Sequence, residues 1–231
     1  MKKYVLLTIS NLFIFLFLPV LRLFNKNIYE KNILPKIINF TCNTNPVSHQ
    51  RKKIIPNAFG VVLEIGSGSG LNFKYYNSEI VSKIIAIDPS IELTFLAEDE
   101  AKKHNLDIEF INKSAEKIPL PDNSIDSVVS TYTLCSIPLP YSTIHEIFRV
   151  LKSGGIFLFS EHGRSPDRFT SFLQDRIEFF YPLISGGCHC NRDILNIIKD
   201  ANFRFQSYES SYLPGTQKFL GFNYWGSAIK P

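Results

Sequence analysis

The sequence is poor in the features that define several specialised classes of protein. Its 231 residues contain four cysteines, one methionine and one tryptophan, with no fixed-period repeat and no low-complexity tract. Four cysteines are too few for a disulfide-stapled scaffold of this length. Apolar residues make up 45% and charged residues 20%, near the globular average, which argues against a disordered chain or a protein with many membrane spans. The length suits one large α/β domain or two small ones.

Acidic residues are nearly missing from the first 60 positions, where Glu30 stands alone beside nine lysines and arginines. Residues 61–231 hold sixteen basic and twenty acidic residues, so their formal charge is −4 (16 − 20). A body with this balance has little positive charge with which to hold a phosphate backbone, and we expect no nucleic-acid partner. The basic leader, in contrast, could lie against an anionic membrane surface.

Residues 4–21 contain no charged side chain, and fourteen of the eighteen are apolar. An uncharged run of this length is at the short end of what spans a bilayer. Three interpretations stay open: a membrane anchor, which we favour, a cleaved signal peptide, or a helix that packs on the domain or lies in the membrane interface. More basic residues follow the run than precede it, so an anchor would keep the C-terminal body on the cytoplasmic side. A soluble cytoplasmic protein is the second expectation.

After Gly60, short β-branched runs alternate with helical patterns. This alternation is typical of a mostly parallel sheet that is covered by helices on both faces. Two extended runs around a Pro-Gly turn at residues 214–215 predict an antiparallel pair that closes the sheet. The expected strands are residues 61–65, 83–87, 108–112, 127–131 and 155–160, the expected helices are residues 92–104 and 141–151, and the two closing runs are residues 203–209 and 219–229.

The strongest functional signal follows the first expected strand, where Glu64 precedes glycines at alternate positions, Gly66, Gly68 and Gly70. Glycines permit a sharp turn and let a ligand approach the main chain. In an open α/β sheet, the carboxyl end of the first strand is where ligands bind. The dinucleotide fingerprint has its third glycine one residue later, so the spacing argues against an NAD-dependent enzyme. A carboxylate at Glu64 suits a ligand with cationic groups.

Three further motifs follow in register. Asp88-Pro89 ends the second strand, eighteen residues after Gly70, where a carboxylate can accept both ribose hydroxyls of an adenosine. Ser114-Ala115-Glu116 follows the third strand, and a segment reading Arg-Val-Leu-Lys-Ser-Gly-Gly at residues 149–155 precedes the fifth. With the glycine loop, these motifs resemble class I methyltransferases of the type 11 group, which depend on S-adenosylmethionine (SAM). The resemblance covers residues 61–160.

The resemblance implies a three-layer, Rossmann-like α/β fold with a seven-stranded, mostly parallel sheet, an antiparallel C-terminal strand and an added N-terminal hydrophobic helix. It divides the chain into a membrane-anchor segment (1–25), a helical preface (26–59) and a SAM-dependent methyltransferase domain (60–231). SAM is the implied cofactor. The residues implied to bind it are Glu64, Gly66, Ser67, Gly68, Gly70, Asp88, Pro89, Ala115, Glu116 and Thr131.

Three short segments resemble one subgroup more narrowly: residues 133–136 (Thr-Leu-Cys-Ser), 160–162 (Ser-Glu-His) and 186–189 (Gly-Gly-Cys-His). They are similar to small bacterial methyltransferases and to animal thiol S-methyltransferases, which carry an N-terminal membrane anchor. The similarity implies a small apolar or amphipathic acceptor, with a thiol favoured and a lipid amine or quinol as alternatives. A non-catalytic module of the same fold, tethered to a membrane, is the competing hypothesis.

Methyl transfer from SAM requires an aligned acceptor in its reactive form, which is a thiolate or a neutral amine. Groups that could favour that form follow the fourth and fifth strands, at the same carboxyl edge of the sheet as the glycine loop, or lie in a later loop. The candidate catalytic residues are His162, Glu161, His189 and Tyr132.

Three other features have weaker implications. Cys188 and Cys190 lack the C-x₂₋₄-C spacing of structural zinc, and Cys135 and His162 would have to complete a site, so we predict no metal. The run Arg51-Lys52-Lys53 predicts a solvated face, with phospholipid headgroups as an alternative partner. In residues 167–184, one helical face predicts either a lid over an apolar acceptor or ordinary core packing; it is made by Phe169, Phe172, Leu173, Ile177 and Phe180.

Overall fold

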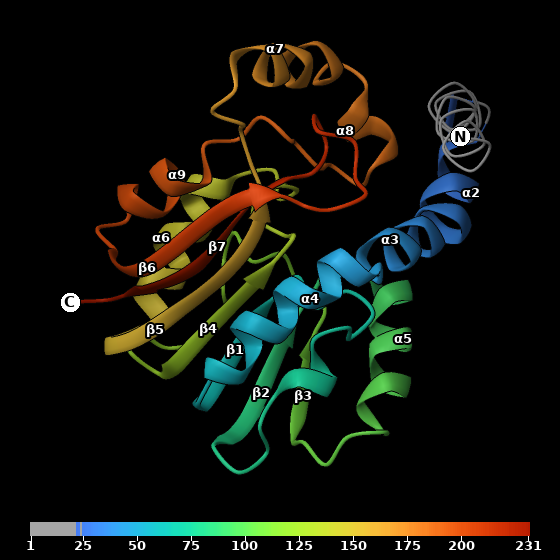
Figure 1. Cartoon of the computed structure of the whole chain (residues 1–231). Coiled ribbons are helices and arrows are strands. Elements are labelled where there is room, and N and C mark those ends of the chain that lie inside the picture. The colour runs from blue at the N-terminus through green and yellow to red at the C-terminus, as the bar shows by residue number, and fades with distance from the viewer. Residues whose placement is uncertain (1–21, 24) are drawn as a thin grey trace.

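The computed structural model of the chain describes residues 22–23 and 25–231. The anchor predicted at residues 4–21 lies outside the described residues. No helix among the described residues is long and apolar enough to cross a bilayer. A seven-stranded sheet with helices on both faces forms the centre of the described part (Figure 1).

The order of the strands in the sheet is β3-β2-β1-β4-β5-β7-β6. The pairs among β1 to β5 are parallel, and β7 runs antiparallel to both β5 and β6, as the sequence predicts. Because the chain crosses from β3 to the other side of β1, the switch between β1 and β4 marks the position where α/β sheets bind ligands. The strands are β1 (Gly60–Ile65), β2 (Val81–Ile87), β3 (Ile108–Ile111), β4 (Ile125–Thr131), β5 (Leu151–His162), β6 (Arg204–Tyr212) and β7 (Phe222–Ile229).

One group of helices precedes the sheet, and the others connect its strands. Prolines stand in the first turn of α3, α4, α6 and α8, where the missing backbone N–H costs nothing. The preface contains α2 (Lys26–Ile28), a π-helical turn η1 (Tyr29–Ile33), α3 (Leu34–Cys42), α4 (Asn45–Ile54) and a 3₁₀ turn η2 (Ile55–Asn57). The remainder are η3 (Phe73–Tyr75), α5 (Ile91–Ala101), α6 (Pro140–Val150), α7 (Arg168–Ile177), α8 (Tyr181–Ile184) and α9 (Ile194–Asp200).

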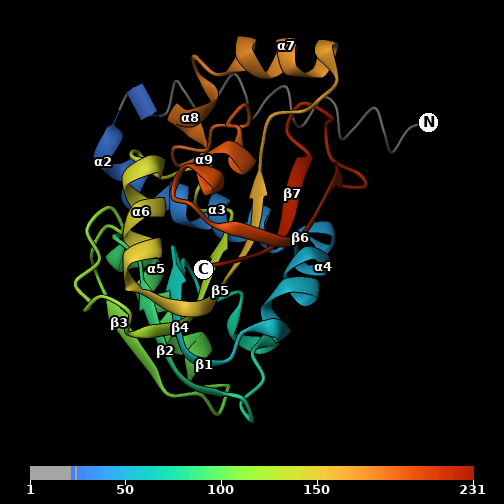
Figure 2. The same cartoon turned by 90° about the vertical axis from the view of Figure 1, so that its left-hand side faces the viewer.

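The two faces of the sheet belong to separate hydrophobic clusters. Helices α6 and α9 cover one face, and α4 and α5 cover the other (Figures 1 and 2). On β1, Leu63 and Ile65 join the cluster on the α6 face, whereas Val62 joins the cluster on the α4 face. Because successive side chains of a strand alternate between faces, Glu64 points with Val62 toward α4. This parity determines which side chains can reach its carboxylate.

Helix α7 presents its aromatic side chains to solvent. Phe169 is 71% exposed and Phe172 is 50% exposed, whereas the polar side chains of Thr170 and Gln174 are buried. Gln174 Nε2 donates a hydrogen bond to the carbonyl oxygen of Cys190 over 2.8 Å. The helix packs with its polar side inward because the loops beneath it carry backbone groups that need partners. Core packing at Phe169 and Phe172, one of the two predictions for this segment, is therefore wrong.

Candidate active site

The glycine loop after β1 makes room for two different neighbours. Gly66 has a φ of +65°, and a Cβ at this position would collide with the side chain of Thr133, so glycine lets the loop pass beside the end of β4. Gly68 has a φ of +55°, and the atom nearest to a Cβ built there is the Gly66 carbonyl oxygen at 4.0 Å. The space beside Gly68 is therefore open to a ligand.

Ser67 and Gly70 complete this loop. The Ser67 hydroxyl is buried and has no hydrogen-bond partner within the described ranges, so it can serve a bound ligand. A Cβ at Gly70 would meet the ring of Phe73 and the Cα of Ala97, so this glycine allows close packing against α5. An orphaned hydroxyl beside open space fits a polar cofactor at the carboxyl end of β1, as predicted for SAM.

Asp88, at the end of β2, directs its carboxylate at the glycine loop. Its Oδ2 accepts a hydrogen bond from the backbone N–H of Gly68 over 2.9 Å, and its Oδ1 accepts one from Ser90 N–H over 2.8 Å. Each oxygen keeps a second lone pair that a ribose hydroxyl could use. Burial raises the pKa of this carboxyl, and the two N–H donors oppose the shift. The geometry fits the predicted ribose contact, while the adjacent Pro89 is exposed.

The loop after β3 is fixed by the motif that precedes β5. Arg149 Nη2 donates to the carbonyl oxygen of Ile118 over 2.9 Å. Glu116 Oε1 accepts a hydrogen bond from the N–H of Leu139 over 2.9 Å, at the start of α6. Ala115 is buried on the same loop. These contacts hold the segment that was predicted to bind SAM.

Glu64 lies at the centre of a buried hydrogen-bond network. The Tyr76 hydroxyl donates to Glu64 Oε2 over 2.6 Å, and Asn72 Nδ2 donates to Glu64 Oε1 over 3.0 Å. Asn72 Nδ2 also lies 3.1 Å from the hydroxyl oxygen of Thr131, which links the network to the end of β4. Burial raises the pKa of Glu64 to about 7, against the opposing effects of its donors and of the positive charge on Arg51. A carboxyl group at this position is therefore engaged by the chain itself.

Arg51 completes the network from α4. Its Nε donates a hydrogen bond to Asn72 Oδ1 over 2.9 Å, and its guanidinium also contacts the carbonyl oxygen of Cys42. The prediction of a solvated face is wrong for Arg51, which is 4% exposed, whereas Lys52 and Lys53 are exposed. The signal that sequence analysis missed is helical spacing, because the buried residues of α4 recur three and four apart: Val47, Gln50, Arg51 and Ile54.

Tyr132 connects this network to the candidate catalytic group on β5. It has a φ of +57°, and its ring lies 5.3 Å from the Arg51 guanidinium carbon. The same ring meets the His162 ring edge-on, with 4.9 Å between centroids. Burial raises the pKa of the Tyr132 hydroxyl. The structure therefore brings two of the four predicted catalytic residues together.

Glu161 serves the loop after β4. Its Oε1 accepts from the Ser130 hydroxyl over 2.7 Å and from the N–H of Thr133 over 3.1 Å, and its Oε2 accepts from the N–H of Cys135 over 3.2 Å. The side chain is fully buried. This geometry supports a positioning role and gives no support to the expectation that Glu161 acts on the acceptor.

The two candidate histidines have different surroundings. His162 is half-buried, and its Nδ1 lies 3.5 Å from Cys188 Sγ and 3.8 Å from Cys135 Sγ. The His189 ring pairs with Glu178 through Nδ1, and its backbone N–H donates to the carbonyl oxygen of Cys135 over 2.7 Å. His162 therefore lies with Tyr132, whereas the ring of His189 is engaged on the side of α7 and α8.

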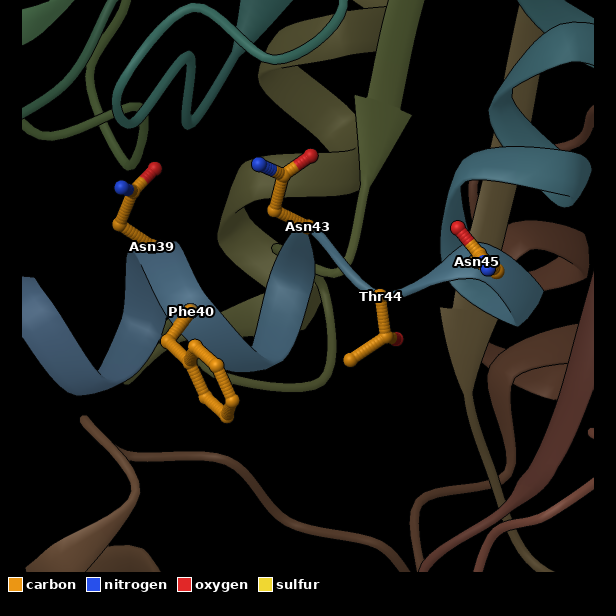
Figure 3. Close-up of a pocket in the computed structure, with 5 residues that line it drawn as sticks. All are labelled: Asn39, Phe40, Asn43, Thr44 and Asn45. Carbon is orange, nitrogen blue, oxygen red and sulfur yellow. The ribbon is translucent and has the colours of Figure 1, made fainter.

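The preface reaches the cofactor loop through α3. The Ser69 hydroxyl donates to Asn39 Oδ1 over 2.6 Å. A pocket opens at the junction of α3 and α4, where the amides of Asn39 and Asn43 point to the opposite side from the Phe40 ring (Figure 3). The pocket is lined by Asn39, Phe40, Asn43, Thr44 and Asn45. The hydrogen bond between Ser69 and Asn39 could not be predicted from the sequence, because an isolated asparagine carries no motif.

Comparisons with known proteins agree with this geometry. Residues 63–159 match the model of the methyltransferase domain family. The chain is 34% identical to thiol S-methyltransferase TMT1B of Rattus norvegicus over 175 residues, which cover 73% of this chain and 70% of the relative. It is 29% identical to thiol S-methyltransferase TMT1A of Homo sapiens over 173 residues, with the same coverage. A solved SAM-dependent methyltransferase from Aquifex aeolicus has the same fold, with a TM-score of 0.59, 20% identity, and coverage of 85% of this chain and 98% of that chain.

The family assignment rests on the identity and coverage of these relatives. The sheet order and the glycine loop facing Asp88 agree with it, and the Ser67 hydroxyl and the open space beside Gly68 fit the cofactor. The chain belongs to the methyltransferase domain family and is a SAM-dependent methyltransferase.

Proposed function

We propose that this enzyme transfers the methyl group of SAM to the sulfur of a small apolar or amphipathic thiol. The similarity to thiol S-methyltransferases of rat and human supports the acceptor class. One structural observation carries the proposal. The half-buried imidazole of His162, at the end of β5, packs against Tyr132, which follows β4, and lies beside two cysteine thiols. An imidazole in these surroundings can deprotonate or orient the sulfur of an acceptor thiol.

The chain's own residues account for binding and alignment. SAM supplies an electrophilic methyl group on a sulfonium. Asp88 would hold the ribose, and Gly68 would let the cofactor lie against the main chain. Tyr132 packs with Val47 and Leu213 in a small buried cluster, which would keep water from the acceptor. Alignment of two bound reactants can contribute about 7–11 kcal/mol to lowering the barrier.

The acceptor must lose its proton because the thiolate is the reactive form. His162 is placed to favour that form, either by accepting the proton or by orienting the sulfur. Substitution of a general base typically costs about 10²–10⁴-fold in rate. His162→Gln should therefore lower kcat/KM for a thiol by about 100-fold or more. His145→Gln is the matched control, because His145 is exposed and pairs with Asp200 on α9; this variant should retain its activity.

The acceptor class is tested by a methyl-transfer screen with the purified full chain. Alkyl thiols, phospholipid amines and quinols are compared at equal concentration, with S-adenosylhomocysteine and the methylated product both measured. We expect turnover with thiols. Methylation of an amine or a quinol without methylation of any thiol would refute the thiol assignment. The non-catalytic alternative predicts no turnover in any arm of the screen.

We further infer that residues 4–21 attach the enzyme to a membrane, with the catalytic domain on the cytoplasmic side. The preface that follows this segment contacts α8, where the Tyr29 hydroxyl donates to the Ile184 carbonyl oxygen over 2.7 Å. The α7–α8 region exposes four large apolar side chains, and exposed apolar surface of this kind is typical of membrane or partner contacts. They are Phe169, Phe172, Phe179 and Leu183.

Cell fractionation tests the attachment. Full-length protein is compared with a chain that starts at Asn25 and with a full-length Phe169→Ser/Phe179→Ser variant. We expect full-length protein in the membrane fraction, the shortened chain in the soluble fraction, and weaker membrane retention of the double variant. Equal solubility of the full-length and shortened chains without detergent would contradict the proposal.

A further inference from the structure

Three potential metal ligands converge beside Tyr132. Cys135 follows β4, His162 ends β5, and Cys188 lies in the loop before α9. The Sγ atoms of Cys135 and Cys188 are 3.7 Å apart. His162 Nδ1 lies 3.8 Å from Cys135 Sγ and 3.5 Å from Cys188 Sγ. The three atoms therefore form a nearly equilateral triangle of two sulfurs and one nitrogen.

The size of this triangle can be compared with the coordination geometry of zinc. Zinc binds thiolate sulfur at about 2.3 Å and imidazole nitrogen at about 2.0–2.1 Å, with tetrahedral angles. Those values place two sulfur ligands about 3.8 Å apart, and a sulfur and a nitrogen about 3.5 Å apart. The three separations at Cys135, His162 and Cys188 differ from these values by a few tenths of an ångström or less. One face of a zinc tetrahedron is thus already formed by the chain.

The backbone around Cys135 is held in place by hydrogen bonds. Glu161 Oε2 accepts from the Cys135 N–H, and the His189 N–H donates to the Cys135 carbonyl oxygen. Arg192 Nη1 donates to the preceding carbonyl oxygen, that of Leu134, over 2.6 Å. Metal sites depend on outer contacts of this kind to fix the direction of each ligand.

The loop that carries Cys188 is held equally closely. Gly187 has a φ of +87°, and a Cβ there would lie 2.8 Å from the Ser136 carbonyl oxygen. Glycine at this position therefore lets the loop approach the segment that carries Cys135. Gln174 joins the same loop to the end of β5, because its side chain donates to the carbonyl oxygens of Cys190 and Gly163.

We propose that Cys135, His162 and Cys188 bind a thiophilic metal ion, for which Zn²⁺ is the matching probe. Two thiolates and one imidazole form a ligand set known from catalytic zinc sites, in which water or substrate takes the fourth position. Binding releases one proton from each thiol. The sequence predicts no metal because Cys188 and Cys190 lack zinc spacing and Cys135 and His162 would have to complete a site, whereas the fold does bring Cys135 and His162 to Cys188.

A role for the fourth position rests on the proposed function. An acceptor thiol that occupies it gives up its S–H proton to solvent and is held as a thiolate. Its sulfur then forms a bond to the methyl carbon as the bond from that carbon to the sulfonium breaks. The electron pair of the broken bond stays on the sulfur of the cofactor, so the products are a thioether and S-adenosylhomocysteine. In this scheme His162 is a ligand of the metal, so of its two proposed roles it orients the sulfur and does not accept the proton.

Metal binding is tested without SAM or acceptor. The full chain is reduced, stripped with a chelator and titrated with Zn²⁺ against a chromophoric competitor. We expect one equivalent to bind. Cys135→Ser and Cys188→Ser should each weaken binding by more than the roughly 10–100-fold that loss of an outer contact costs. Cys42→Ser is the control, because Cys42 lies on α3 outside the triangle, and it should bind as the unmodified chain does.

A spectroscopic measurement separates loss of a ligand from loss of fold. Co²⁺ bound in place of Zn²⁺ should show the absorption of a tetrahedral thiolate site, reduced in both serine variants while their circular dichroism is unchanged. The proposal is overturned if the reduced chain binds less than half an equivalent, or if all three cysteine variants bind alike. It is also overturned if Cys135 and Cys188 form a disulfide and the reduced protein takes up no metal.

Two further measurements keep this proposal apart from the proposed function. Thiol methylation is measured before chelation, after chelation and after reloading with Zn²⁺, and SAM affinity is measured in the same samples. We expect methylation to fall and recover while SAM affinity stays constant. Unchanged methylation without metal would refute a metal-bound acceptor. If Zn²⁺ binds but no thiol is methylated in any sample, the thiol assignment fails and the metal site stands.

Discussion

Arg51 and Asn72 are joined by a buried hydrogen bond of 2.9 Å between Nε and Oδ1. Through Asn72 this contact reaches Glu64 on β1, so a helix that precedes the sheet is coupled to the strand that carries the cofactor loop. Arg51 is only 4% exposed. Its hydrogen bonds to the Asn72 amide oxygen and the Cys42 carbonyl oxygen, with the Glu64 carboxyl group beyond Asn72, explain why a charged side chain can be accommodated in the core.

Removal of Arg51 should destabilise the protein. Arg51→Met leaves the Asn72 and Cys42 oxygens without this donor, and unsatisfied buried groups cost about 1–3 kcal/mol each. We expect a loss of about 2–4 kcal/mol in the free energy of unfolding, measured by urea denaturation. Lys52→Met, at an exposed neighbour, should stay within about 0.5 kcal/mol of the unmodified chain. Equal effects of the two substitutions would contradict the network.

Glu64 should make stability dependent on pH. Burial raises its pKa from 4.5 to about 7 in the folded protein, with Tyr76, Asn72 and Arg51 acting in the opposite direction. Between these two values the folded state holds a proton that the unfolded state has lost. The free energy of unfolding should therefore fall as pH rises from about 4.5 to 7, by about 3 kcal/mol in total.

Glu64→Gln isolates this contribution because glutamine does not titrate. The measured quantity is the difference in unfolding free energy between the variant and the unmodified chain, without SAM, across that pH range. Its absolute size reflects repacking, whereas its slope reports the carboxyl. A difference that stays constant with pH would show that the pKa of Glu64 is not raised in the fold.

Gly68 and Gly154 form a matched pair for the cofactor site. Both have positive φ, +55° and +75°, and neither has a neighbour closer than 4.0 Å to a built Cβ. Alanine at either position should cost about 1–2 kcal/mol of stability through its left-handed conformation. Only Gly68→Ala should also weaken SAM binding, by about tenfold or more, because its methyl group fills the space beside the loop. Equal SAM affinities in the two variants, measured by calorimetry, would place the cofactor elsewhere.

The strands of the sheet and the glycine loop could be predicted because each depends on a local pattern. Apolar runs fix the strands, and the glycine spacing marks the turn after β1. The start of β5 was placed too late, since the strand begins at Leu151, which pairs with Ile125 of β4, and residues 151–154 include a glycine and two polar residues. Local composition did not reveal that the neighbouring strand would hold them extended.

The parts of the site that were missed depend on contacts between distant segments. Arg51 was taken for part of a basic surface run, because its neighbours Lys52 and Lys53 are exposed and only the helical phase of α4 separates them. Cys135 and His162 were named as the residues that would have to complete a site with Cys188, but they lie at two strand ends, and no spacing within one segment could show that the three would meet.

The aromatic residues of α7 illustrate the converse problem. The pattern correctly predicts a helix, and α7 begins at Arg168 after the Asp167 cap. The period cannot tell whether the apolar side faces the protein or solvent. Gln174 settles the orientation here, because its side chain satisfies backbone groups beneath the helix. The exposed aromatics then become available to a membrane or an acceptor.

The role of the β1–β2 edge is measured most directly by calorimetric titration of SAM into the purified full chain and into its Asp88→Ala variant. The carboxylate of Asp88 faces Gly68 and is proposed to hold two ribose hydroxyls. Two lost hydrogen bonds to a charged group should raise the dissociation constant by about 100-fold. We expect submillimolar binding by the unmodified chain and this loss in the variant. Identical affinities, or no binding by either protein, would contradict a SAM site formed by Asp88 and the glycine loop.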